Sequence, residues 1–383
     1  MIEKKNFLVL SITPWETPIP SSAHFLMKEF SRRNRILFVN HPLTFKDAIG
    51  KKRVRENLLR LDENFWVLTP PPFFPINFLP EGRSYSFCLG RQAELTARAI
   101  LAAMKRIELI SPIFWISFDV PLGEALIGKF EEKMRIYHRF DEIRGQPYLA
   151  RHGGPHEKKL IESCDLVFSS SPNLMEGKEK FFLLPNGVEH AFFARALEEL
   201  EIPPDLGEIP RPRIGFLGNI DERMNKDLLK KLLREKPEWS LVLIGPAQER
   251  AMREFSDFQN FHWLGPKNYS LAPNYLAGFD VGIIPYVRSL QTSGIYPLKI
   301  NEYLAAGLPV VSTDFAPLEE FRDVTEISSE SGFVEAVERA LLENSREKRR
   351  NRSLFAFSNS WEKRAERVSA CIEGFLLFSE GKR

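Results

Sequence analysis

A lysine and a glutamate, Lys299 and Glu302, stand three residues apart, and this spacing places them on one face of a helix. An ammonium group can meet the phosphates of a nucleotide, and a carboxylate can accept hydrogen bonds from two ribose hydroxyls. Ser293, Gly294 and Ile295 come just before them, where a predicted helix start would offer free N–H groups to an anion. The residues favour a site for a nucleoside diphosphate; the alternative is a solvated pair with no ligand.

The elements that must position this pair follow from the pattern around it. A buried strand at 280–284 runs into a loop, and a helix follows with Pro297 near its first turn, where proline fits best. Gly307 suits the left-handed position just past the helix, and 309–312 reads as a second buried strand. A strand–loop–helix–strand unit builds a parallel sheet, and such sheets bind ligands at the carboxyl ends of their strands.

A second candidate cluster follows the predicted strand 213–217. Gly218 ends that strand and allows a ligand to approach the backbone closely. Asn219 comes next, and then Arg223 and Lys226, either of which could pair with phosphate; alternatively both cations lie on a solvated helix start. The stretch lacks the three-glycine fingerprint of dinucleotide sites, which argues against a nicotinamide enzyme.

Aromatic and turn residues complete the predicted second half. Gly265 follows the predicted strand 261–264, and backbone groups at its turn could read the edge of a nucleobase. Tyr269 or Tyr286 could flank a base or a sugar. The alternative for Tyr286 is packing in the core.

Polar groups also follow strands in the first half. Asp141 comes after the predicted strand 135–138 and could orient an acceptor hydroxyl or accept its proton; its alternative role is a helix N-cap. Trp15 and His24 follow the first predicted strand. Trp15 could stack on a sugar or pack internally, and His24 could act as a base or lie on a helix face.

These stretches resemble the GT-B glycosyltransferases, near family 4 and the teichuronic-acid-type enzymes. In those families a Glu-x7-Glu motif precedes a small-residue turn and a Pro-Val-Val strand. NEYLAAGLPVVST puts Glu302 at the second motif position, while Gly294 occupies the first. Asn219 stands where the family has an arginine, and His138 where an aspartate is common. The resemblance implies an α/β protein of the GT-B fold, with two Rossmann-like domains whose parallel sheets face a cleft.

The resemblance also implies an activity. It would be transfer of a sugar, with retention and without a metal, from a UDP- or GDP-linked donor to a hydroxyl of a glycan or lipid-linked acceptor in cell-surface polysaccharide synthesis. Asp141, Lys299 and Arg223 would be catalytic, and no cofactor beyond the nucleotide sugar is implied. Two alternatives remain, a nucleotide-sugar epimerase on the same fold and a non-catalytic nucleotide-binding scaffold. The departures at Gly294 and Asn219 favour the scaffold.

Composition sets the remaining limits. The 383 residues suffice for two domains, and 53 Lys and Arg against 51 Asp and Glu give no bulk charge for nucleic acid. Three scattered cysteines suit a reducing cytosol and show no metal spacing. No apolar stretch has membrane-spanning length. The basic stretch 46–61 predicts either peripheral contact with the inner face of the plasma membrane or a solvated helix.

The predicted organisation is an acceptor-side domain at 1–195, a proline-rich linker at 196–212, a donor-binding domain at 213–355, and a helix at 356–383 that crosses back to the first domain. Residues 69–80 read as a loop because prolines break regular structure there. The predicted strands are 7–12, 35–40, 65–69, 113–117, 135–138, 165–170, 182–184, 213–217, 241–244, 261–264, 281–284, 310–312 and 325–328. The predicted helices are 22–32, 92–105, 228–235, 333–342 and 354–378, the last interrupted near 358–360.

Overall fold

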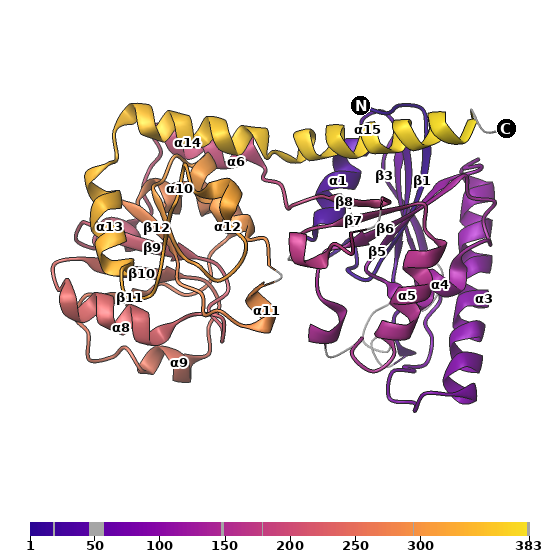
Figure 1. Cartoon of the computed structure of the whole chain (residues 1–383), viewed down its shortest axis with the longest axis horizontal. Helices are drawn as coiled ribbons and strands as arrows, with labels where there is room; N and C mark the ends of the chain where they lie inside the picture. The colour runs from indigo at the N-terminus through magenta and orange to yellow at the C-terminus, as the bar shows by residue number, and fades with distance from the viewer. Residues whose placement is uncertain (18–19, 46–56, 147–148, 178, 294, 381–383) are drawn as a thin grey trace. The chain divides into compact units, whose positions relative to one another are not determined.

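The computed structural model describes residues 1–17, 20–45, 57–146, 149–177, 179–293 and 295–380. The chain divides into two compact units (Figure 1). The first comprises Met1–Pro185 and Arg364–Arg383, and the second comprises Asn186–Lys363. Helix α15 (Trp361–Glu380) therefore begins in the second unit and belongs to the first from Arg364 onward.

The first unit is built on a sheet with the strand order β3-β4-β2-β1-β5-β6-β7-β8. Every neighbouring pair is parallel except β3 and β4, which are antiparallel. The strands are β1 (Asn6–Ser11), β2 (Arg35–Asn40), β3 (Asn57–Asp62), β4 (Phe65–Thr69), β5 (Ile113–Ser117), β6 (Met134–Arg139), β7 (Leu166–Ser169) and β8 (Phe181–Leu183).

Helices cover both faces of this sheet, which explains why its strands are continuous apolar runs. Leu8 and Leu10 belong to the core shared with α3, while Phe7 stacks at 5.0 Å on Phe30 of α1. The helices of this unit are α1 (Ser22–Ser31), α3 (Arg83–Arg106), α4 (Val120–Leu126), α5 (Gly153–Ser163) and the single turns η1 (Ile143–Gly145) and η2 (Pro172–Leu174).

The second unit contains a sheet with the order β11-β10-β9-β12-β13-β14, in which every pair is parallel. Its strands are β9 (Arg213–Leu217), β10 (Ser240–Ile244), β11 (Phe261–Trp263), β12 (Val281–Ile284), β13 (Val310–Thr313) and β14 (Glu326–Ser328). Its helices and turns are α6 (His190–Phe193), η3 (Ala194–Leu197), α7 (Pro204–Gly207), α8 (Lys226–Glu235), α9 (Glu249–Arg253), η4 (Tyr269–Leu271), α10 (Ala272–Ala277), α11 (Leu290–Ser293), α12 (Leu298–Ala305), η5 (Glu319–Phe321), α13 (Phe333–Leu342) and α14 (Arg346–Ser358).

Helix α8 shows how the local sequence sets these elements. Leu228 and Leu232 are buried one turn apart, so one face of the helix joins the core. The side chain of Asn225 accepts a hydrogen bond from the Leu228 amide at 3.0 Å and caps the helix, a contact that typically contributes about 1 kcal/mol. Burial of one such leucine contributes about 1.5–3 kcal/mol more.

Several expectations change on the structure. The predicted linker 196–212 lies within the second unit, where Leu206 and Ile209 are buried in its core. Strand β3 was not predicted, and it occupies the end of the stretch 46–61; residues 46–56 lie outside the described part. Helix α3 begins at Arg83, well before the predicted start.

Other expectations are confirmed. The α/β class with parallel sheets is observed, and the last helix is interrupted between α14 and α15. Residues 70–80 carry no regular helix or strand, as their prolines predict. None of the helices in the described residues combines the length and apolar character needed to cross a bilayer.

Candidate functional site

Lys299 lies against the end of β9. A Cβ atom at position 218 would stand 2.0 Å from Cε of Lys299 and 2.6 Å from its Nζ, so a side chain there would force the end of the lysine to move. Gly218 has a φ of +154°, which also favours glycine. The ammonium group lies 5.8 Å from the centre of the Phe216 ring. The structure thus brings together two predicted donor-site residues that are far apart in the chain.

The turns after β9, β10 and β11 pack backbone against backbone beside this lysine. A Cβ atom on Gly245 would lie 1.9 Å from the carbonyl oxygen of Gly218. The Gly245 amide donates to the carbonyl of Gly265 at 2.9 Å. Gly265 has a φ of +68°, and the space next to its Cα is open. Glycines therefore build a close backbone surface at the carboxyl edge of the second sheet, where ligands of such sheets bind.

Glu302 lies on the same helix as Lys299, within α12, and is partly buried. Burial raises the pKa of its carboxyl group, the charge of Lys299 opposes that rise, and the charge of Glu189 adds to it. Glu189, which precedes α6, was not predicted as a site residue. An acidic residue before a short helix looks like an ordinary helix start, so the sequence held no signal for its place beside Glu302.

The predicted anion site before α12 is wrong in its details. The helix begins at Leu298, later than expected. The amides of Ser293 and Ile295 are already used, since they donate to the carbonyls of Ser289 at 2.9 Å and Thr292 at 3.0 Å. The first backbone N–H groups of α12 belong instead to its own opening residues. The remaining predicted residue of this loop, position 294, lies outside the described part of the chain.

Arg223 is held by Asp221 in a two-pronged ion pair. Its Nε and one terminal nitrogen donate to the two carboxylate oxygens at 2.8 and 2.6 Å. Asn219 also donates to Asp221, at 2.6 Å. The Arg223 guanidinium lies 5.3 Å from the centre of the Tyr286 ring. Tyr286 is only 3% exposed, so its predicted contact with a ligand is wrong and it serves as core and as a platform for the arginine.

Lys226 opens α8 and donates to Glu254 at 2.7 Å. Together with Asn219 it lines a hollow of about 370 Å³, with Pro246 and Gln248 on the opposite wall. Because these residues follow β9 and β10, the hollow lies at the same edge of the sheet as Lys299. The cation of Lys226 thus lies at the predicted donor-side edge of the sheet and is already paired with one carboxylate.

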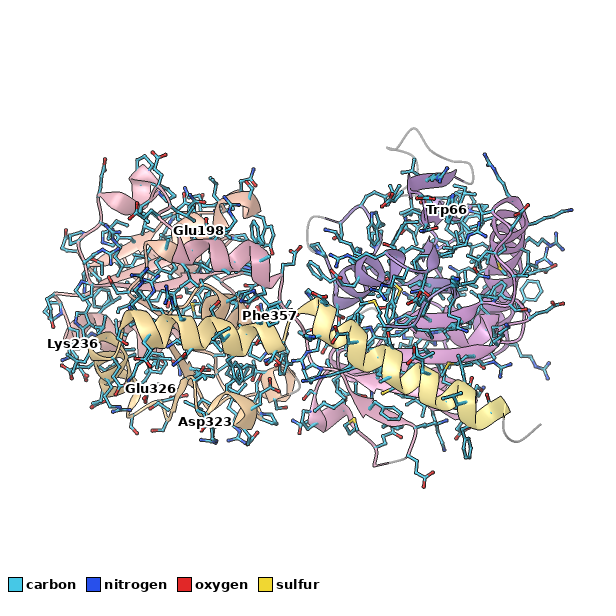
Figure 2. All side chains as sticks on the ribbon, turned by 90° about the horizontal axis from the view of Figure 1, so that it is seen from above. Trp66, Glu198, Lys236, Asp323, Glu326 and Phe357 are labelled. Carbon is cyan, nitrogen blue, oxygen red and sulfur yellow. The ribbon has the colours of Figure 1, made fainter. Side chains whose placement is uncertain are left out.

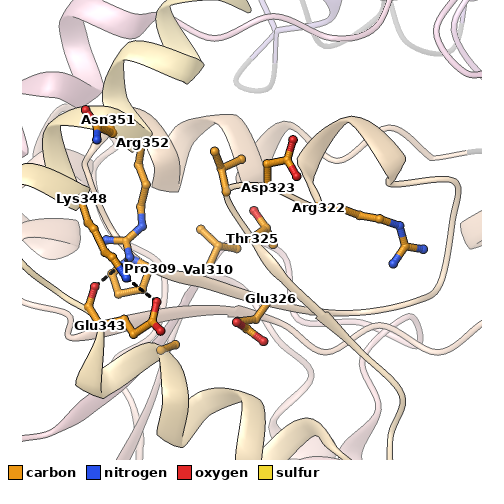
Figure 3. Close-up of a pocket in the computed structure, with 12 residues that line it drawn as sticks. Pro309, Val310, Arg322, Asp323, Thr325, Glu326, Glu343, Lys348, Asn351 and Arg352 are labelled. Carbon is orange, nitrogen blue, oxygen red and sulfur yellow. Dashed lines mark hydrogen bonds and ion pairs between the residues drawn. The ribbon is translucent and has the colours of Figure 1, made fainter.

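Another hollow in the second unit, of about 250 Å³, lies at the opposite edge of the sheet (Figure 3). Pro309 and Val310 line it where β13 begins. Lys348 pairs with Glu343 at 2.5 Å, and Arg352 donates to the backbone of Glu343 at 3.3 Å. Its charges therefore neutralise one another, and it is separate from the edge that carries Lys299.

The predicted residues of the first unit are engaged in local contacts. Asp141 accepts a hydrogen bond from the Glu142 amide at 2.8 Å and another from the side chain of Gln146. These bonds hold the turn that contains η1. Neither contact is the bond of an N-cap to the second or third amide of a helix, and the role of Asp141 toward an acceptor stays a prediction.

His24 serves as a helix cap, so the prediction that it could be a base is wrong. It is 5% exposed, and its Nδ1 accepts from the Ser21 amide at 3.1 Å. Its Nε2–H then donates to the Pro14 carbonyl at 3.1 Å. Burial lowers the pKa of His24. Trp15 stacks on its ring at 5.1 Å and contacts Phe65 at 4.5 Å, so the tryptophan is largely packing.

A histidine–carboxylate pair that was not predicted joins two loops at the carboxyl edge of the first sheet. His41 Nδ1 and Asp119 Oδ2 are 2.7 Å apart. Burial alone would lower the pKa of His41, but the charge and hydrogen bond of Asp119 outweigh it and raise that pKa. Phe118, just before the aspartate, has a φ of +59°, a strained conformation for a bulky residue. Within the described ranges, no group of three or more His, Cys, Asp or Glu residues could hold a metal ion.

The fold and the glycine-lined edge define a class of protein. Sucrose-phosphate synthase of Thermosynechococcus elongatus matches 98% of this chain and 100% of its own, with a TM-score of 0.70 and 14% identity. A UDP-forming α,α-trehalose-phosphate synthase of Burkholderia xenovorans matches 97% of this chain and 99% of its own, with a TM-score of 0.70 and 15% identity. The chain has the GT-B fold.

The second unit resembles a described family. Residues 211–343 match the family described as Glycosyl transferases group 1, and this range contains all the predicted donor-side residues. The chain thus has the GT-B fold, and this part of its second unit is similar to group 1 glycosyl transferases. TuaH of Bacillus subtilis (strain 168), named as a glycosyltransferase of teichuronic acid biosynthesis, is 28% identical over 218 residues. The match covers 51% of this chain and 54% of TuaH, about half the length of that relative.

Proposed function

We propose that this chain is a glycosyltransferase that moves a sugar from a nucleotide-diphosphate donor to a hydroxyl of a glycan or lipid-linked acceptor in cell-surface polysaccharide synthesis. The observation that carries the proposal is the placement of Lys299 against Gly218, with Glu302 on the same helix. All three lie in the segment that matches group 1 glycosyl transferases. The name of the related TuaH supports the assignment to polysaccharide synthesis.

The chemistry assigned to the site is charge stabilisation. As the sugar–phosphate bond breaks, negative charge grows on the departing diphosphate, and a fixed ammonium group at Lys299 would stabilise it. Arg223 would add to this by exchanging Asp221 for a phosphate oxygen. Following the family resemblance, we propose retention: the acceptor oxygen bonds to the anomeric carbon on the face that the phosphate leaves, and the acceptor proton passes to that phosphate.

The proposed donor is UDP-linked. This part of the proposal is supported by the structural neighbour from Burkholderia xenovorans, which is described as UDP-forming. The backbone around Gly265 would face the uracil, since its turn lies at the same edge as Gly218. A GDP-linked donor is the competing possibility that the experiment must separate.

Thermal unfolding with UDP, GDP, ADP and CDP tests this function. A nucleotide present at about 100 times its Kd adds about 2.7 kcal/mol to the free energy of unfolding, so UDP should raise the Tm and the others should raise it less. Donor hydrolysis with UDP-glucose and related nucleotide sugars then tests for turnover. No shift with any of the four nucleotides would contradict the proposal, and binding without turnover would favour a scaffold.

Because the proposed acceptor can be lipid-linked, we also propose that the first unit makes peripheral contact with an anionic membrane. Phe74, Phe78 and Phe87 are 67–69% exposed, an unusual cost for three large apolar side chains. The loop that carries Phe74 is pinned, because Phe73 donates to the Leu43 carbonyl at 2.9 Å. The basic residues predicted to assist, at 46–56, lie outside the described part.

Vesicle sedimentation tests this contact. The protein should sediment with vesicles of phosphatidylglycerol and phosphatidylcholine, and the double change Phe74→Ser with Phe78→Ser should weaken binding at least tenfold, since burying one phenylalanine contributes about 1.5–3 kcal/mol. The matched control is Leu342→Ser, which removes an apolar side chain that is 83% exposed in the second unit. Equal sedimentation of all three proteins would remove the membrane from the proposal.

A further inference from the structure

A second carboxylate lies near Glu302, and it comes from a distant part of the chain. Glu189 immediately precedes α6, and α6 packs against α12, the helix that carries Glu302 (Figure 1). Burial is the main cause of the raised pKa of Glu302, and the charge of Glu189 makes a smaller contribution in the same direction. Both residues lie in the second unit, so the pair is a feature of that unit alone.

Tyr269 contacts the first of these carboxylates, that of Glu189, directly. Its hydroxyl donates to Oε2 of Glu189 at 3.2 Å, and its ring stacks on Phe192 at 5.1 Å with an interplanar angle of 19°. Burial raises its pKa, with further contributions from the charges of Glu302 and Glu189. The tyrosine still exposes 52% of its surface. Its ring is therefore fixed on α6, while its edge stays open at the turn that follows Gly265.

The groups around Glu302 indicate which hydrogen-bond donors the two carboxylates still need. Lys299 supplies one positive charge from the same helix, and Glu189 supplies a negative charge from the residue before α6. Burial raises the pKa of the Tyr269 and Tyr303 hydroxyls, and the charge of Glu302 in turn adds to that rise. Two carboxylates close together repel each other unless donors bond to both. Tyr269 provides one donor, and a diol would provide two more in the geometry that paired carboxylates accept.

We propose that Glu189 is a donor-site residue that acts together with Glu302, the two carboxylates receiving a vicinal diol of the nucleotide sugar. The diol belongs either to the ribose or to the transferred sugar. The inference rests on the proposed function and adds to it a residue that was not predicted as a site residue. It also supplies a second acidic group to a site whose motif has glycine at position 294.

The test is calorimetry with UDP, 2′-deoxy-UDP and UDP-glucose on the wild type and on Glu189→Gln. A charge-assisted hydrogen bond to a hydroxyl is stronger than the neutral bond that replaces it, so we expect about tenfold weaker binding. If the diol is that of the ribose, UDP binding weakens and the variant no longer distinguishes UDP from 2′-deoxy-UDP. If the diol is that of the sugar, UDP binding is unchanged and UDP-glucose binding weakens.

Two further variants separate direct contact of Glu189 with the ligand from a role of Glu189 in holding Tyr269 in place. Asp205→Asn is the matched control, because Asp205 also accepts from a tyrosine, Tyr275, at 3.1 Å in the same unit, and it should bind all three ligands like the wild type. Tyr269→Phe removes the hydroxyl that bonds Glu189 but keeps the stacked ring, and it should lose less affinity than Glu189→Gln. Equal losses in these two variants, or no loss in Glu189→Gln, would overturn the inference.

The outcomes also distinguish this inference from the proposed function. A wild-type protein that binds none of the three ligands contradicts the function, and the role of Glu189 falls with it. A wild-type protein that binds UDP while Glu189→Gln binds all three equally well leaves the function standing and overturns only this inference.

Discussion

The carboxyl edges of the two sheets differ in how their polar groups are used. In the second unit, Lys299 lies against the backbone of Gly218, and Glu302 is on the same helix. In the first unit, His24 has hydrogen-bond partners at both ring nitrogens, and His41 pairs with Asp119. The proposed function assigns the second edge to a charged ligand, whereas these polar groups of the first edge hold its own loops.

The difference explains why the donor side is easier to recognise than the acceptor side. A diphosphate needs cations and close backbone, which require glycines and a lysine at defined places. An acceptor is recognised by shape and by hydroxyl contacts that many side chains can supply. Residues such as Asp141 therefore fit both a loop-holding role and a binding role, and the chain sequence alone does not separate them.

Removing Lys299 should have the largest effect. It tests whether the carboxyl edge of the second sheet acts by stabilising negative charge. Lys299→Ala should lower donor turnover about 100- to 1,000-fold, because a fixed charge at the leaving group is lost, while UDP affinity should fall much less. The control is Lys236→Ala, because this lysine lies away from the site and its Nζ donates to Glu338 at 2.7 Å. Lys236 is labelled in Figure 2. Equal losses in turnover and affinity would instead indicate simple binding.

The next largest expected effect is a loss of folding stability at low pH, caused by His138 on β6 in the first unit. This histidine is fully buried, and burial lowers its pKa to about 3. Neither of its ring nitrogens has a hydrogen-bond partner among the residues that the structure describes. Below pH 6.5 the unfolded chain takes up a proton that the folded chain refuses, so stability conferred at neutral pH is lost as the pH falls. Between pH 7.5 and pH 4.5 this amounts to about 3 kcal/mol.

The comparison with His138→Phe isolates this effect. Phenylalanine suits the site, because the ring of His138 lies 5.4 Å from Trp115 and 5.6 Å from Phe140. Urea unfolding of both proteins at the two pH values cancels every other titrating group. The variant should lose less stability on acidification than the wild type, and an identical loss would show that His138 is not held neutral.

The smallest effect concerns Glu302. Glu302→Gln should weaken UDP binding about tenfold, because a charged acceptor is replaced by a neutral one. Its raised pKa also predicts a pH dependence. As the pH falls through that pKa the carboxylate is protonated, so the wild type should lose affinity toward the variant's level. Calorimetry across pH 4.5–7.5 checks this, and parallel curves for the two proteins would contradict it, since the ionisation of UDP is common to both.

Much of the fold could be predicted from the sequence because most strands are buried on both faces and read as apolar runs. Strand β3, with the sequence NLLRLD, was missed because it alternates weakly and follows a basic stretch. The resemblance to GT-B glycosyltransferases is confirmed by the fold and by the match over residues 211–343. The predicted linker failed because the burial of Leu206 depends on contacts with distant residues.

The candidate site was predictable where it depends on local spacing. Lys299 and Glu302 share a helix, so their common face follows from the helix period. The helix start was misplaced because Pro297 is extended, with a ψ of 115°, and precedes the helix instead of opening it. Glu189 and the pairing of Arg223 with Asp221 depend on how loops fold back, and the linear pattern holds no signal for either.

The most direct measurement is a crystal structure of the protein with UDP. The account predicts diphosphate density between the backbone of Gly218 and the ammonium group of Lys299, with the ribose beside Glu302. Density for UDP elsewhere, for example in the hollow lined by Lys348 and Arg352, or an unliganded edge at saturating UDP, would contradict the account.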